Sequence, residues 1–357
     1  MSGKKAATVQ KKDSIFKRSD IATVAIILIG FVALMVIIEL IQGQFKFFTV
    51  ANWMNILMQN SVVGIMAMGM TIVMISGGID LSVGYLASLA GIFVAKAIVQ
   101  WGWGVWPAII VGVLLCIALE MGLGAIIAYL DVEPFIITLG GSICFRGVAL
   151  LMSQSREIVM KNHEMEFVKT NIFETTTAGG TKIQLPVYIL IFIAIAIVVW
   201  FVLKYTKYGR RVYAVGANSD AAYLAGVNTR RLKLSTYILN GLLVGVASIV
   251  LLGRVGTAII TNGQGLEIDV IACVVIGGVA MSGGKGNGMG TFLGILLLGA
   301  ITNAMNVLKL QSEWQYVVKG AIIIAAVAVG ALANKLAAKS ELARQRQEAL
   351  AEQKKEE

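Results

Sequence analysis

The stretch that orients the whole chain is KYTKYGRRVYAVGANSDAAYLAGVNTRRLK, residues 204–233, a long polar run between the apolar segments of the second half. It holds seven Lys/Arg residues and a single acid, Asp220. Basic segments of membrane proteins are retained on the cytoplasmic side. We therefore expect residues 204–233 to face the cytoplasm, and this placement sets the side of every other connecting segment.

A short helix is predicted in the middle of this stretch. Asn218 and Ser219 carry side-chain oxygens suited to an N-cap, and Asp220 lies where the helix dipole favours an anion. Gly226 can end the helix in a left-handed conformation. These signals predict a helix over Ala221–Ala225.

The next apolar segment begins with its own predicted cap, at Asn228 or Thr229. The short helix is thus expected between two basic turns. Its small side chains would allow close approach of another protein and its larger ones would anchor it: Ala221, Ala222, Ala225, Tyr223 and Leu224. Two interpretations stay open, a loop held at the membrane by its charges and a docking helix for a soluble partner.

Composition places the chain in the membrane. Of 357 residues, 57% are hydrophobic and 14% charged, and the mean hydropathy is +0.81, whereas soluble domains carry about 25% charge. The predicted fold is an all-α polytopic membrane protein. Its net charge of +10 indicates orientation and contact with the lipid bilayer rather than nucleic-acid binding. The cysteines all fall in apolar segments, which argues against disulfides or a metal site: Cys116, Cys144 and Cys273.

About ten apolar segments are long enough to cross a hydrocarbon core of about 30 Å. They are Ile21–Gln42, Asn55–Ser76, Leu81–Val99, Val105–Leu130, Phe135–Met152, Leu185–Leu203, Leu234–Ile259, Asp269–Met281 with its Gly-rich extension, Met289–Met305 and Trp314–Asn334. Six precede residues 204–233 and four follow. This parity predicts that both termini and the central stretch lie in the cytoplasm.

The predicted organisation follows from these spans. Residues 1–20 form a basic cytoplasmic N-terminus, residues 21–334 the transmembrane domain, and residues 335–357 a charged cytoplasmic tail. Residues 153–184 form the sizeable outside loop, in which four Lys/Arg residues balance four acids, as expected for a translocated segment.

Two glycine-rich motifs predict an internal repeat. GGIDLSVG at residues 77–84 matches GGVAMSGG at residues 277–284, two hundred positions later. Glycine pairs interrupt helices, and a broken backbone at membrane depth persists where it is buried in protein or lines a wet cavity. The alternative is a pair of tight turns at the membrane surface. The span count puts both breaks on the same side.

Polar residues inside the apolar segments mark a candidate translocation path, because polar groups in a membrane face protein or water. Together with the breaks they give this set: Gln59, Asn60, Gly77, Gly78, Asp80, Ser82, Gly277, Gly278, Ser282 and Asn303. Glu120 and Arg254 also lie deep, as candidates for structural pairing or for lining the path.

No motif for catalysis is present. The nearest partial match to a phosphate-binding loop, Gly278–Gly286, has Gly284 where the motif requires a Lys. The single histidine belongs to no Ser/His/Asp arrangement. We expect no enzyme activity, cofactor or metal in this chain, so a partner must supply the energy for any work.

Several motifs in order resemble one known family: GGIDLSVG at Gly77, TLGG at Thr138, residues 208–233, the segment from Ile271 and WQYVVKG from Trp314. Over Ile21–Asn334 the chain resembles the membrane-spanning permease of bacterial ABC importers for monosaccharides of the ribose, galactose, xylose or arabinose type. The resemblance implies an inner-membrane homodimer of ten-helix subunits and an extracytoplasmic sugar-binding protein. It also implies two cytoplasmic ATPase subunits that bind ATP and Mg, with Asn218–Gly226 as the coupling helix.

Two other classes stay open. In an ion- or proton-coupled secondary transporter of a small polar solute, Asp80 and Glu120 would titrate during transport. In a membrane scaffold or receptor, nothing would be transported. An ATPase that cosediments with the chain would favour the importer, and uptake that collapses with an uncoupler while ATP remains would favour the secondary transporter.

Overall fold

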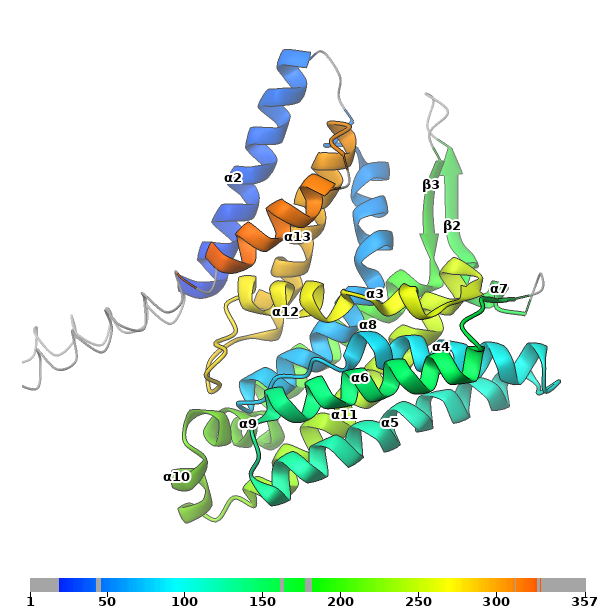
Figure 1. Ribbon diagram of the computed structural model, residues 1–357. Helices are drawn as coiled ribbons and strands as arrows, with labels where there is room; N and C mark the ends of the chain where they lie inside the picture. The colour runs from blue at the N-terminus through cyan, green and yellow to red at the C-terminus, as the bar shows by residue number, and fades with distance from the viewer. Residues whose placement is uncertain are drawn as a thin grey trace, which may run out of the picture. The chain divides into compact units, whose positions relative to one another are not determined.

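The computed structural model describes residues 19–42, 46–160, 164–176, 182–311, 313–325 and 328 (Figure 1). The chain divides into two units, residues 1–311 and 312–357. In the second unit residues 313–325 are helical, which matches the start of the predicted last span. The remainder of that span, most of the basic N-terminus and the tail 335–357 lie outside the described residues.

Helices account for most of the first unit. The long ones are α2 (Ser19–Gln42), α3 (Val50–Ile75), α4 (Val83–Val99), α5 (Val105–Leu130), α6 (Pro134–Ser153), α8 (Val187–Tyr205), α11 (Thr229–Val255) and α13 (Gly288–Val307). The short ones are α7 (Glu166–Lys169), α9 (Lys207–Ala217), α10 (Ser219–Leu224), α12 (Leu266–Ile276) and the 3-10 helix η1 (Ile260–Gly263). Each predicted apolar segment of this unit coincides with a helix, although boundaries move by several residues.

Among the described residues, seven helices have the length and composition needed to cross a membrane: α2, α3, α5, α6, α8, α11 and α13. The predicted spans at α4 and α12 are shorter, with 17 and 11 residues. The protein is therefore a multi-pass membrane protein with seven candidate spans by this criterion.

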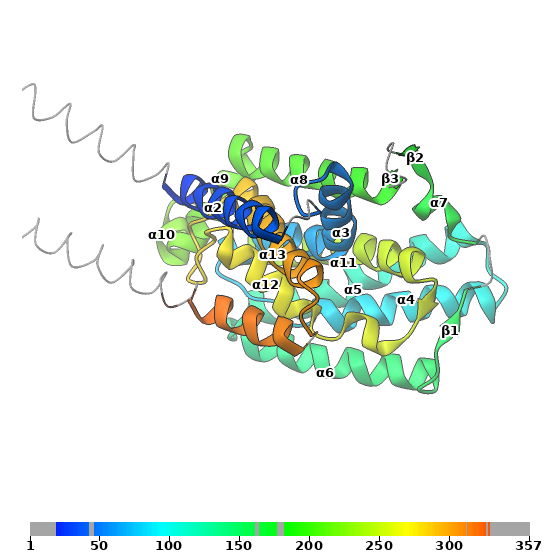
Figure 2. The same cartoon turned by 90° about the horizontal axis from the view of Figure 1, so that it is seen from above.

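The all-α prediction missed four short strands. β1 (Ile158–Val159) pairs with β4 (Thr257–Ala258), and β2 (Asn171–Thr176) forms an antiparallel hairpin with β3 (Lys182–Pro186). Three of these strands fall in or beside the predicted outside loop. Figure 2 shows the hairpin at one end of α8, while α9 and α10 lie at the other end, as in Figure 1. The predicted outside and inside segments are thus separated by the length of a helix.

The core forms around α3, where the run from Gly64 to Ile75 is entirely buried. α11 packs along α3 and α5 and joins them (Figure 1). The approach to α5 is close because an added Cβ at Gly241 would lie 2.8 Å from the Cys116 carbonyl oxygen, and at Gly245 3.0 Å from Val113 Cα. Small residues thus let the two backbones touch, as membrane helices often do.

Candidate functional site

The polar stretch 204–233 contains two helices where one was predicted. α9 precedes α10, and the Thr206 hydroxyl caps it by accepting a hydrogen bond from Gly209 N at 3.1 Å. Gly209, Val212 and Val215 are buried and lie three residues apart, so they form one face of a helix that packs on the rest of the chain. The prediction of a single short helix was wrong because this narrow buried face was read as part of a basic turn.

The predicted caps of α10 and α11 are confirmed. Asn218 Oδ1 accepts a hydrogen bond from Ala221 N at 2.8 Å, and Asn228 Oδ1 accepts one from Arg231 N at 3.0 Å. Gly226 has φ of 83°, the left-handed conformation expected at a helix end. α10 itself begins two residues earlier than predicted, at Ser219, and ends at Leu224.

The side chains of α10 divide between protein and surface. Tyr223 is 68% exposed and Leu224 is 86% exposed, whereas Ala222 is only 5% exposed. The Ala222 side chain packs within its own chain and is not part of the exposed surface of α10. Ala221 and Ala225 are exposed, and Ser219 and Asp220 lie at the first turn, partly or fully exposed.

α9 contacts both glycine breaks through backbone atoms. Gly284 N, at the end of the second glycine motif, donates a hydrogen bond of 2.9 Å to Ile75 O at the end of α3. A Cβ at Gly216 of α9 would overlap Ile75 O and lie 2.6 Å from Gly284 N. A Cβ at Gly283 would lie 2.8 Å from both Gly77 Cα and Gly216 O. We call Gly77, Gly216, Gly283 and Gly284 the glycine junction.

A side-chain contact strengthens this junction. Tyr213 of α9 donates its hydroxyl hydrogen to Gly286 O at 2.8 Å. The tyrosine is half-buried, and burial raises the pKa of its hydroxyl above the usual value. It therefore stays protonated and able to donate at physiological pH.

The two breaks lie side by side, yet their conformations differ. In the first, Gly77 has φ of 90°, and in the second Gly278 has φ of 85°. Ser82 is fully buried, whereas Ser282 is exposed. Gly78 and Gly277 are buried and have no positive φ. Residues at equivalent positions of the two motifs therefore do not adopt the same local structure, and the internal repeat stays a prediction.

The first break continues into a buried polar cluster. Asp80, Ser82, Glu120 and Asn240 each have 0% exposure. Asp80 Oδ1 accepts hydrogen bonds from Ser82 N at 2.8 Å and from Ser82 Oγ at 2.7 Å, and Asp80 Oδ2 accepts one from Asn240 Nδ2 at 2.6 Å. Ser82 Oγ also lies 2.9 Å from Glu120 Oε1. The cluster ties the break to α5 and α11.

The remaining predicted path residues lie elsewhere. Asn303 Oδ1 accepts a hydrogen bond from Asn52 Nδ2 at 2.9 Å, and Asn60 Nδ2 donates to Ile56 O at 2.8 Å. The main-chain carbonyl oxygen of the exposed Gln59 accepts a hydrogen bond from Arg254 Nη1 at 3.3 Å. Asn60 lies on α3, 15 residues before the helix ends at Ile75, so it is about 22 Å along the helix from the break. The structure thus separates the predicted path into two groups.

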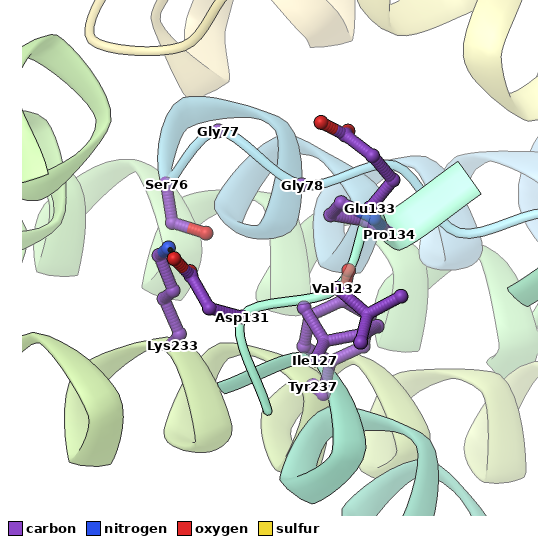
Figure 3. Close-up of a pocket in the computed structure, with 10 residues that line it drawn as sticks. All are labelled: Ser76, Gly77, Gly78, Ile127, Asp131, Val132, Glu133, Pro134, Lys233 and Tyr237. Atoms are coloured by element: carbon purple, nitrogen blue, oxygen red, sulfur yellow. Dashed lines mark ion pairs between the residues drawn. The ribbon is translucent and has the colours of Figure 1, made fainter. Parts of the chain in front are cut away.

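A pocket of about 250 Å³ opens beside the first break. Figure 3 shows Ser76, Gly77 and Gly78 on one side and Asp131 and Lys233 across from them. Lys233 Nζ and Asp131 Oδ1 are 3.7 Å apart. The pocket is further lined by Ile127, Val132, Glu133, Pro134 and Tyr237. It brings the break, the α5–α6 connection and the start of α11 together.

Comparison with known proteins identifies the family. Residues 52–327 match the family described as branched-chain amino acid transport system / permease component. The chain belongs to this permease family. No solved structure matches it.

Several relatives of this permease are named as transport proteins for sugars. It is 37% identical over 303 residues to the ribose import permease protein of Escherichia coli (strain K12), with 84% of this chain and 91% of the relative covered. It is 35% identical over 292 residues to the D-allose transport system permease protein of the same organism, covering 81% and 86%. With the xylose transport system permease protein of Haemophilus influenzae it shares 32% identity over 328 residues, covering 77% and 88%. The resemblance to sugar permeases is confirmed.

Sequence reasoning missed two functional features of the permease. It did not single out Gly216, although a glycine in the last turn of a helix next to an Asn cap is a local signal for close packing. It also did not join Asn240 of α11 to Asp80. That pairing spans 160 positions, and no local pattern indicates it.

Proposed function

We propose that this permease is the membrane-spanning subunit of an ATP-driven ABC importer that moves a monosaccharide across the bacterial inner membrane. Its relatives are named for ribose, D-allose and xylose, and these support a sugar of that class as the cargo. Separate ATPase subunits bind ATP and Mg and hydrolyse ATP. The permease itself carries no cofactor and catalyses no reaction.

The coupling element in this proposal is Asn218–Gly226, with α10 at its centre. The supporting observation is the position of α10 directly after α9, because α9 contacts both breaks at the glycine junction. The side chains of Tyr223 and Leu224 are exposed and form an apolar surface on α10. A helix of six residues is not stable alone, so its caps and a partner groove must fix it. Motion of an ATPase subunit would then move α9 and, through it, the breaks.

The proposed topology has ten spans. Adding α4, α12 and the helix at residues 313–325 to the seven long helices gives this number. The N-terminus, residues 204–233 and the tail 335–357 are cytoplasmic, and residues 153–184 are outside. The separation of α9 and α10 from the β2–β3 hairpin along α8 supports this arrangement (Figures 1 and 2). The permease works as a homodimer and receives sugar from an extracytoplasmic binding protein.

The glycine breaks belong to the moving part of the translocation path in this proposal. Gly77 and Gly78 line the pocket of Figure 3, and Gly277 and Gly278 connect α12 to the junction. Asp80 and Ser82 anchor the first break, and Ser282 lies exposed in the second. Gln59, Asn60 and Asn303 form the far end of the path, and the glycine repeat is the remnant of a duplicated unit.

A second candidate function rests on the buried carboxyl groups of Asp80 and Glu120, which are the type of group that carries protons in secondary transporters. If protons drove uptake, an uncoupler would abolish uptake in cells whose ATP is maintained. Uptake that instead follows ATP, and persists with the uncoupler, supports the importer.

The coupling proposal is tested by two substitutions on the same inside segment. Leu224→Asp puts a charge on the exposed tip of α10, where burial against a partner without a pair costs several kcal/mol by order of magnitude. Arg230→Asp reverses a charge at an exposed position of α11 outside the coupling element. Both chains should insert and fold, because both side chains are exposed.

Co-purification of the ATPase subunits and sugar uptake in proteoliposomes distinguish the two interpretations of the loop. We expect Leu224→Asp to release the ATPase subunits and abolish uptake, with Arg230→Asp close to wild type. If the segment is only an anchor held by its charges, Arg230→Asp is the more damaging change. That order of effects would reject α10 as the coupling helix.

A further inference from the structure

In the buried cluster at the first break, one serine hydroxyl lies between two carboxyl groups. Ser82 Oγ lies 2.7 Å from Asp80 Oδ1 and 2.9 Å from Glu120 Oε1. A serine hydroxyl has one hydrogen to donate, and an ionised carboxylate can only accept. Ser82 can therefore satisfy one carboxylate. The other contact is favourable only if a carboxyl group carries a proton and donates it to Ser82 Oγ.

The hydrogen-bond partners decide which carboxyl carries the proton. Asp80 accepts three hydrogen bonds, from Ser82 N, Ser82 Oγ and Asn240 Nδ2, and a carboxylate surrounded by donors is stabilised as the anion. Glu120 Oε2 has no hydrogen-bond partner among the described residues. Leaving the oxygen of a neutral acid unpaired in a buried site costs less than leaving that of a carboxylate. The proton is thus more stable on Glu120 than on Asp80.

No ion pair among the described residues includes either carboxyl group of the pair: Lys182 pairs with Glu174, and Lys233 pairs with Asp131. The other titratable groups that interact with the pair are Tyr237 of α11, which interacts with both carboxyls, and Cys116 of α5, which interacts with Glu120. Neither side chain carries a positive charge in any protonation state, so a second buried negative charge would be uncompensated.

We propose that Asp80 and Glu120 together hold one proton, which resides on Glu120. The hydrogen-bond chain runs from the Glu120 carboxylic acid to Ser82 Oγ and from Ser82 to the Asp80 carboxylate. The site binds a proton at the point where residues 77–82 leave α3 and α4 begins, and it fastens this segment to α5. Thr138 Oγ1 of α6 lies 3.3 Å from Ile79 O, although its single hydrogen has a closer acceptor in Pro134 O at 2.9 Å, so α6 packs against the same segment. The proposal holds whatever the cargo of the permease is.

Infrared difference spectroscopy of the purified full-length chain tests the protonation directly. A buried neutral carboxylic acid gives a carbonyl stretching band that is distinct from carboxylate bands and that shifts on deuteration. We expect this band in the wild type, its loss in Glu120→Gln and its retention in Glu133→Gln. The second variant is the matched control, because Glu133 is exposed in the connection between α5 and α6.

Thermal unfolding in detergent provides a second measurement. The amide introduced by Glu120→Gln can donate to Ser82 Oγ as the acid does, so this variant should unfold within about 2 °C of wild type. In Asp80→Asn the amide NH2 group is itself a donor and would face groups that donate to Asp80 in the wild type. This variant should unfold at a temperature about 5 °C or more below that of the wild type. Because Glu120 ionises on unfolding at neutral pH but not when folded, wild type should lose stability as the pH rises, and Glu120→Gln should lose less.

The opposite results overturn the proposal. A band that survives in Glu120→Gln and disappears in Asp80→Asn places the proton on Asp80. The absence of any such band in the wild type means that both groups are ionised. If both variants unfold early, their spectra are recorded below their unfolding temperatures, where the loss or survival of the band in the folded chains still decides which residue holds the proton.

Discussion

The glycine junction predicts that a single methyl group on α9 uncouples ATP hydrolysis from uptake. In Gly216→Ala the added Cβ would overlap Ile75 O and lie 2.6 Å from Gly284 N, so it must displace the Gly284 N–Ile75 O hydrogen bond of 2.9 Å. Loss of a hydrogen bond costs about 0.5–1.5 kcal/mol and overpacking about 1–3 kcal/mol. The higher helix propensity of Ala offsets about 1 kcal/mol.

The net cost is about 2 kcal/mol, the middle of a range of roughly 0.5–3.5 kcal/mol, and it acts on the arrangement in which α9 touches both breaks. An energy of this size changes the equilibrium between two conformations by roughly 5- to 150-fold. We therefore expect Gly216→Ala to reduce sugar uptake at least fivefold in proteoliposomes that contain the whole complex. The ATPase activity of the complex that contains this variant should fall less, because α10 and its exposed face are unchanged.

The matched control is Gly147→Ala in α6, another helical glycine, where an added Cβ meets no atom within 4 Å. Uptake, ATP hydrolysis and the thermal midpoint are measured for both variants in parallel. Equal uptake and equal midpoints in Gly216→Ala and Gly147→Ala would show that α9 does not transmit motion through this contact.

Three further predictions concern the breaks and the topology. Gly78→Val should lose uptake while still inserting, because its side chain would meet Tyr237 Oη at 2.7 Å and Val73 Cγ1 at 3.0 Å; normal uptake would make the break a simple turn. Gly278→Val should also lose uptake, since φ of 85° strains a β-branched residue by about 1–3 kcal/mol, and wild-type rates would remove this requirement. With the exposed Cys144 replaced by Ser, an impermeant thiol reagent should label Glu174→Cys from outside intact cells and Ser219→Cys only after lysis; the reverse pattern inverts the map.

Local signals sufficed for several elements of the site. Asn218 and Asn228 are caps whose chemistry is readable from neighbouring residues, and both accept the expected backbone hydrogen bonds. The apolar segments were readable because a membrane span is set by length and composition. The strands were missed, although Ile172, Phe173 and Thr175 are residue types that favour β structure. Their segment was judged by its balanced charges instead.

Other features depend on contacts that no local pattern contains. The burial of Ala222 depends on how α10 folds back on its own chain, and its sequence neighbours Ala221 and Ala225 are exposed. The glycine pairs were readable as breaks, but their meeting at Gly216 was not, because it joins residues 77, 216 and 283. The same limit applies to Glu120, whose partner Ser82 lies 38 positions earlier.

The bond between Asp80 and Asn240 also bears on how the chain enters the membrane. The ribosome makes about 160 residues between these two positions, which takes roughly 10–30 s at usual rates of synthesis. During that interval Asp80 and Glu120 have emerged while α11, which supplies Asn240, has not. The hydrogen bond from Asn240 to Asp80 can therefore form only after α11 has been made, so the carboxyl cluster is completed late in synthesis.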